Sequence, residues 1–169
     1  MLAAVAMIAV GSASSSVQAQ EAPAAQPATE GSLFVGGGLG PGFYLNGGGS
    51  GFHLEAAVGY AFMDQLYGVF VPSFLFGGGT TLITIPVGVQ YDVPIPSVPN
   101  LYVYPRLSIG LGFVTAGGDV HFAFIPEAGV KYVIQGKYYI GFEPFSLPIY
   151  FGDGTATVYR LNFLGGVYF

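Results

Sequence analysis

The sequence of 169 residues contains no cysteine, only four lysines and arginines, and a charged fraction of 8%. Without cysteine, disulfides, thiolate metal sites and cysteine nucleophiles are excluded. Nine acidic residues outnumber the basic ones and give a formal net charge of −5, which disfavours nucleic-acid binding because that depends on basic groups. Soluble domains average about 25% charged residues. The composition therefore argues against a surface built for water.

Long apolar runs are also missing beyond the first residues of the chain, although hydrophobic residues make up 52% of it. A transmembrane helix needs about 20 consecutive apolar residues. The other way to cross a bilayer with every backbone polar group paired is a closed β-barrel, whose strands alternate apolar and polar residues. The sequence thus predicts an all-β protein that spans a membrane.

The chain divides into three parts. An apolar stretch from Leu2 to Val10 and small residues at Val17 and Ala19 predict a signal peptide over residues 1–19, although no basic residue precedes the stretch. A buried N-terminal helix is the alternative. Residues 20–31 are rich in Ala and Pro and predict a flexible tether. Residues 32–169 form the predicted barrel.

From residue 32 onward, turn residues separate segments long enough for tilted strands, each of which needs about 9 to 11 residues to cross. These segments predict an eight-stranded antiparallel up-and-down transmembrane β-barrel. An even number of strands puts the two chain ends of the barrel on one side of the membrane and leaves short loops on the other. The segments are 33–46, 51–63, 65–76, 81–93, 101–115, 119–134, 137–151 and 155–169.

Side-chain parity supports each segment, because successive residues of a strand face opposite ways. In 81–93, Ile85, Val87 and Val89 share one face while Thr84 and Gln90 share the other. The ionisable residues of 119–134 likewise fall on one face. A soluble barrel would invert this parity, but the polar face is mostly small residues and carries too few charges to coat a soluble protein.

The eightfold alternating pattern and the ending Gly165-Gly166-Val167-Tyr168-Phe169 resemble the small eight-stranded bacterial outer-membrane β-barrels, such as the barrel domain of outer-membrane protein A and its single-domain relatives. The resemblance implies the outer membrane of a Gram-negative cell, contact with outer-membrane lipids, and an assembly signal at Tyr168 and Phe169 for the outer-membrane assembly machinery. The short loops, the strand prolines and the lack of a peptidoglycan-binding domain depart from the pattern.

Four charges near the middles of the last four segments point inward, where opposite charges could pair: Arg106, Glu127, Glu143 and Arg160. Because a buried ion needs a partner, this predicts a lumen ion cluster that packs the barrel. A gate or a pore lining is the alternative.

Two further pairs, His53 with Glu55 and Asp119 with His121, are predicted at the outer rim. Imidazole beside carboxylate can bind a metal or perform acid–base chemistry, but the two pairs lie on opposite strands. The simpler expectation is two hydrogen-bonded rim histidines, with no metal, cofactor or catalysis. Ser50 near His53 is the only candidate for a lipid A-modifying enzyme.

Prolines inside the predicted strands cannot donate to the ladder, so they predict bulges or interruptions. They are Pro72, Pro86, Pro105, Pro126, Pro144 and Pro148. A proline-disturbed wall resembles the outer-membrane protein W family, in which it implies lateral passage of hydrophobic molecules, but strand bending is the simpler interpretation. We therefore expect a structural envelope protein, with a narrow porin-like conduit as the alternative.

Overall fold

The computed structural model describes residues 29–47 and 49–169. The predicted signal peptide and positions 20–28 of the predicted tether lie outside these residues. Every regular element within the described residues is a β-strand. None of these residues belongs to a helix long and apolar enough to span a membrane.

The strands follow the predicted segments to within a few residues at each end. They are β1 (Leu33–Tyr44), β2 (Gly49–Met63), β3 (Leu66–Phe70), β4 (Ser73–Gly77), β5 (Thr80–Tyr91), β6 (Val93–Pro94), β7 (Leu101–Val114), β8 (Val120–Ile134), β9 (Tyr138–Ser146), β10 (Ile149–Phe151) and β11 (Thr155–Tyr168).

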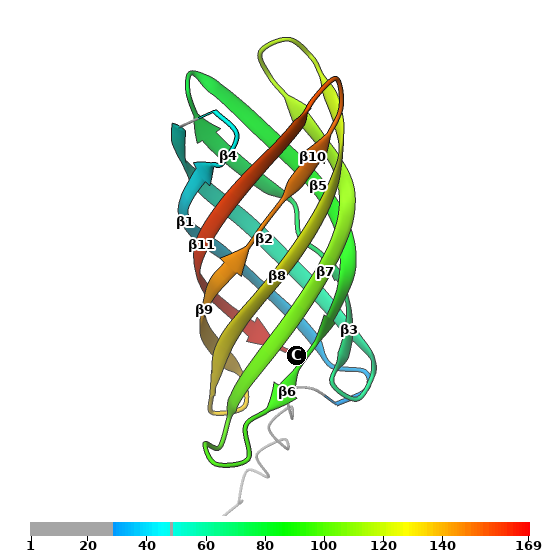
Figure 1. The fold of residues 1–169 in the computed structure, drawn as a ribbon. Helices are drawn as coiled ribbons and strands as arrows, with labels where there is room; N and C mark the ends of the chain where they lie inside the picture. Colours follow the sequence, from blue (N-terminus) through cyan, green and yellow to red (C-terminus); the bar gives the residue numbers. More distant parts are fainter. Residues whose placement is uncertain (1–28, 48) are drawn as a thin grey trace, which may run out of the picture.

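These strands close into one antiparallel barrel (Figure 1). β3 and β4 together form one strand of the ring, and so do β9 and β10, which gives eight strands around it. β1 closes the ring, because Leu39 faces Leu54 of β2 on one side and Phe163 of β11 on the other. The two residues of β6 pair with β7 at the end that holds the chain terminus. The predicted eight-stranded fold is confirmed.

Prolines lie at two breaks in the strands, as predicted. The prediction is wrong for Pro105, because the ladder between β7 and β8 runs without interruption through Pro105 and Pro126. β3 and β4 are separated at Val71 and Pro72, and this gap faces Pro86 of β5. β9 and β10 are separated at Leu147 and Pro148, and this gap faces Pro126 of β8. The ladder between β9 and β11 shifts register beside Pro144. Backbone hydrogen bonds still bridge both breaks: Ala56 donates to the Pro72 carbonyl at 3.0 Å and Val158 donates to the Pro148 carbonyl at 2.9 Å.

Large apolar side chains cover the outside of the barrel. The outward faces carry exposed Phe, Tyr, Leu, Ile and Val along every long strand, including Phe52, Val87, Ile109, Ile140 and Phe163. In β5, Val87 and Val89 are exposed while Thr84 and Gln90 are buried, so the predicted parity is confirmed. A soluble barrel with an apolar inside and a charged outside is excluded by this arrangement.

Charged side chains avoid the apolar belt altogether. Among the described residues, each Asp, Glu, Lys and Arg is either buried inside the barrel or placed in a turn at its ends. The turn residues are Glu30, Asp64, Asp119, Lys137 and Asp153. Because an ion in hydrocarbon is costly, this distribution is that of a wall which faces lipid.

The inward residues of β8 show how the interior is layered. From the loop end of the barrel they run His121, Ala123 and Ile125, then Glu127, and then Lys131. Ala123 and Ile125 belong to an apolar layer with Leu75, Leu82, Tyr150 and Val158. Beyond Glu127, Lys131 lies over the rings of a second, aromatic layer near the termini. The charged groups thus lie between two packed layers.

Candidate functional site

The middle layer of the lumen holds six ionisable side chains, here called the central cluster: His53, Glu55, Arg106, Glu127, Glu143 and Arg160. Arg106 Nε donates to Glu127 at 2.5 Å and Arg106 Nη2 donates to Glu143 at 2.9 Å. Arg160 Nη2 donates to the other oxygen of Glu127 at 2.9 Å. The structure therefore brings together the four charges predicted for the lumen, and it buries all of them.

Polar neighbours complete the bonding of the cluster. Tyr104 and Asn162 each donate to Glu143, at 2.9 and 2.8 Å. Ser146 donates to Glu127 at 2.8 Å and accepts from Arg160 at 3.0 Å. Glu127 and Glu143 are thus fully engaged, which is the condition for keeping buried carboxylates charged.

His53 and Glu55 do lie near each other, with His53 Nε2 3.8 Å from Glu55 Oε2, but the prediction that this pair lies at the rim is wrong. His53 is completely buried, and its ring nitrogens lie 2.9 Å from Asn162 Oδ1 and 2.6 Å from Arg160 Nη1. Glu55 Oε1 lies 3.5 Å from Arg106 Nη2. The reason is the stagger of tilted strands in a barrel, which brings the first half of β2 level with the middles of the other strands.

Glycines in β1 make room for these contacts. Gly38 faces Glu55, and Gly40 lies between His53 of β2 and the region of Asn162 in β11. A Cβ atom at Gly38 would lie 3.2 Å from Glu55 Oε1 and against the Leu164 side chain. The glycines of this segment therefore allow close packing of the lumen.

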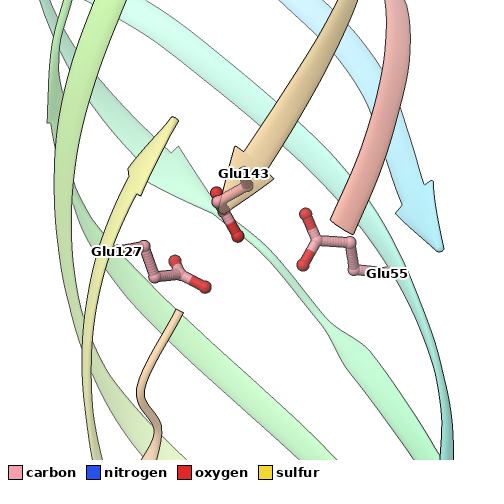
Figure 2. A group of neighbouring side chains, drawn as sticks. All are labelled: Glu55, Glu127 and Glu143. Carbon is pink, nitrogen blue, oxygen red and sulfur yellow. The ribbon is translucent and has the colours of Figure 1, made fainter. Parts of the chain in front are cut away.

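Three carboxylates of the cluster converge, as Figure 2 shows. One oxygen each of Glu55, Glu127 and Glu143 lies within 4.8 Å of the others, a spacing that could suit a cation. However, the Arg106 guanidinium contacts all three carboxylates. A metal ion there would meet a fixed positive charge, so the residues present do not fit a metal site.

A second charged pair lies nearer the termini, and we call its surroundings the lysine cage. Lys131 Nζ is 2.6 Å from Asp92 Oδ2, and Gln90 donates to the other Asp92 oxygen at 2.8 Å. Five rings surround the ammonium group with centroids at 5.3 to 5.7 Å, those of Phe34, Tyr67, Tyr104, Tyr139 and Tyr168. Cation–π attraction and the ion pair both hold Lys131 in place.

Very little space remains between the central cluster and the lysine cage. The cavity lined by Glu55, Gln90, Arg106 and Lys131 has a volume of about 10 Å³, about enough for one water molecule. Side chains of the described residues therefore fill most of the lumen between the central cluster and the lysine cage.

The loop end of the barrel opens into a wider space, which we call the mouth pocket. Its volume is about 390 Å³, and Tyr44, Ser50, Leu82, His121 and Tyr150 contribute to its lining. His121 is half-buried here and Asp119 is exposed on the adjoining turn. Of the two pairs predicted at the rim, only Asp119 and His121 lie at this end.

Ser50 and His53 do not meet in a catalytic arrangement. Ser50 lines the mouth pocket, whereas both ring nitrogens of His53 are engaged in the central cluster. The Nδ1 atom of His121 is buried without a hydrogen-bond partner, so no carboxylate orients that ring through it. These positions supply no nucleophile paired with an oriented base.

The last two residues point in opposite directions. Tyr168 is buried in the lysine cage, while Phe169 is 63% exposed on the outside. The backbone of Phe169 exchanges hydrogen bonds with Leu33 at 2.8 and 3.2 Å. Phe169 thus presents its ring outward while its backbone is paired with the first strand.

This chain is similar to known proteins in its fold. No family model and no curated protein matches the sequence. Among solved structures, the Neisserial surface protein A has a TM-score of 0.68 at 16% identity, covering 83% of this chain and 100% of its own. The N-terminal β-barrel domain of OprF from Pseudomonas aeruginosa has a TM-score of 0.61 at 15% identity, covering 83% and 98%. This chain has the fold of a small outer-membrane β-barrel.

A third barrel of this kind widens the comparison. OprG, an outer membrane protein of Pseudomonas aeruginosa, has a TM-score of 0.57 at 12% identity and covers 85% of this chain and 98% of its own. Because the likeness runs over nearly the whole of each neighbour, it extends to the entire ring of strands. At these identities it concerns the fold alone.

The sequence pattern did not single out the lysine cage as a site. Parity predicts that Asp92 and Lys131 both face inward, near the same end of two segments that are separated by the segment 101–115. Their pairing also depends on register, which a single strand pattern does not contain. Asn162 and Ser146 were missed as cluster members for the same reason.

Proposed function

We propose that this protein is an integral protein of the outer membrane, a closed barrel that contributes to envelope structure without catalysis. The observation that carries the proposal is the filled lumen. The central cluster and the lysine cage follow one another along β8, and the cavity between them has a volume of about 10 Å³. A protein built this way supplies a rigid, lipid-facing cylinder.

A conduit through the lumen is the alternative, and the buried contacts weigh against it. A solute would have to separate Arg106 from Glu127 and Lys131 from Asp92, which leaves buried ions without partners. Lateral passage at the prolines would have to break the hydrogen bonds that Pro72 and Pro148 accept across the interruptions. Passage through the lumen would thus break buried ion pairs, and lateral passage would break backbone hydrogen bonds.

Catalysis on lipid A is the second alternative. It needs a hydroxyl or carboxylate nucleophile beside an oriented histidine at the outer edge of the membrane. Ser50 and His121 share the mouth pocket, but His121 has no hydrogen-bonded partner at Nδ1. The geometry of this pocket favours a non-catalytic barrel.

The test is single-channel recording of the refolded protein in planar bilayers. We expect a flat trace from the wild type, with a general porin as the positive control. The matched variant is Arg106→Ser/Glu127→Ser, which removes one positive and one negative group and shortens two side chains of the cluster. We expect conductance steps from this variant, and steps of the same size from the wild type would overturn the proposal.

A further inference from the structure

The central cluster does not balance its formal charges. Three glutamates would carry three negative charges, whereas Arg106 and Arg160 carry two positive ones. The Lys131 and Asp92 pair is balanced by itself. An uncompensated ion in the middle of a membrane barrel is costly, so one further positive charge has to reside in the cluster.

His53 does not supply it. Its Nε2 atom lies 2.6 Å from Arg160 Nη1, which can only donate, so Nε2 accepts and carries no hydrogen. Its Nδ1 atom then donates to Asn162 Oδ1 at 2.9 Å, while the Asn162 amide nitrogen donates to Glu143. These contacts fix His53 as a neutral ring.

Glu55 differs from the other two glutamates. Glu127 and Glu143 accept hydrogen bonds on both oxygens. Glu55 is 4% exposed, and neither of its oxygens has a hydrogen-bond partner. Its nearest cation is Arg106, at 3.5 Å, and that guanidinium is already bonded to the other two carboxylates.

We propose that Glu55 is a buried proton-binding site and is held as a neutral carboxylic acid in the folded barrel. One proton on Glu55 makes the cluster neutral and leaves Glu127 and Glu143 ionised among their donors. The groups that face Glu55 are Arg106 from β7, Glu127 from β8, Glu143 from β9, Arg160 from β11 and His53 from its own strand, with Gln90, Tyr104, Lys131 and Tyr139 around the adjoining void.

Infrared spectroscopy of the full chain tests the proposal directly. At pH 7 an exposed glutamate, with an ordinary pKa of about 4.3, is ionised. We expect the wild type to show the C=O stretch of a neutral carboxylic acid, which moves to lower frequency when the protein is refolded in D2O. Labelling glutamate with ¹³C must also move the band. The absence of a glutamic acid band would overturn the proposal.

Stability identifies which glutamate holds the proton. Glu55→Gln replaces a neutral acid by a neutral amide of the same shape, so its urea midpoint should equal that of the wild type. Glu143→Gln removes an ionised acceptor and should lower the midpoint, and Glu30→Gln in an exposed turn is the matched control. A Glu55→Gln barrel that fails to fold, or loses as much as Glu143→Gln, would place the proton elsewhere and overturn the assignment.

Discussion

Replacing Lys131 by methionine should destabilise the barrel more than most single substitutions. Lys131 lies 2.6 Å from Asp92 and inside five aromatic rings. Removing one partner of a buried ion pair costs about 3–5 kcal/mol, and a desolvated cation–π contact contributes about 2 kcal/mol. Methionine at this position recovers part of the lost cation–π energy through its own contacts with the aromatic rings. We expect a net loss of about 4 kcal/mol.

The double variant Lys131→Met/Asp92→Asn distinguishes the contribution of the ion pair to stability from that of the surrounding aromatic rings. The amide introduced at position 92 keeps an oxygen to accept the hydrogen bond from Gln90, and no charge of the pair remains buried. Because replacing a whole buried pair is often close to neutral, we expect this variant to lie within about 1.5 kcal/mol of the wild type. The second substitution should thus restore most of what the first one removes.

Reversible urea unfolding in lipid vesicles measures these differences, followed by tyrosine fluorescence because the sequence contains no tryptophan. Lys137→Met, in an exposed turn beside Tyr138, is the control for the change in net charge and should cost less than about 1 kcal/mol. The reasoning is refuted if the double variant loses as much as the two single variants together, since Lys131 and Asp92 would then act independently.

The remaining predictions concern assembly and packing. Unboiled protein in detergent should migrate differently from boiled protein on gels, and identical migration would contradict a folded membrane barrel. Deleting Phe169 should lower insertion in cells while leaving refolding into detergent intact, because its ring is exposed. Equal insertion of the wild type and the deletion variant would contradict an assembly signal at Phe169. Gly38→Val should cost about 1–3 kcal/mol by overpacking against Glu55, measured by urea unfolding, whereas Gly68→Ala, whose added Cβ stays 3.9 Å from Phe62, should cost less.

The strand pattern could be predicted because alternation is a local property of each segment. Val87 and Gln90 face opposite ways whatever their neighbours are, and lipid requires the apolar face to point outward. The depth of His53 and Glu55 could not be predicted in this way, since it depends on the stagger between strands. For the same reason the pattern placed Arg106, Glu127, Glu143 and Arg160 inside without giving their bonds.

The prolines illustrate the same boundary between local and non-local information. Each proline removes a ladder donor, so interruptions near them could be predicted. Whether a strand breaks depends on what lies opposite, and at Pro72 and Pro148 a second proline faces the gap. That coincidence is set by register between segments far apart in the chain.

The ladder between β1 and β11 has a consequence for the order of events in folding. Phe34 meets Tyr168, and Tyr44 meets Val158, so this seam joins the first strand of the barrel to the last. Every other long ladder joins strands that follow one another along the chain. Since pairing between segments far apart in the chain is slow, we expect the ladder between β1 and β11 to form last. Until then, two unpaired edges remain exposed to hydrocarbon or to other chains, so a chain cut short before β11 should be a substrate for quality-control proteases.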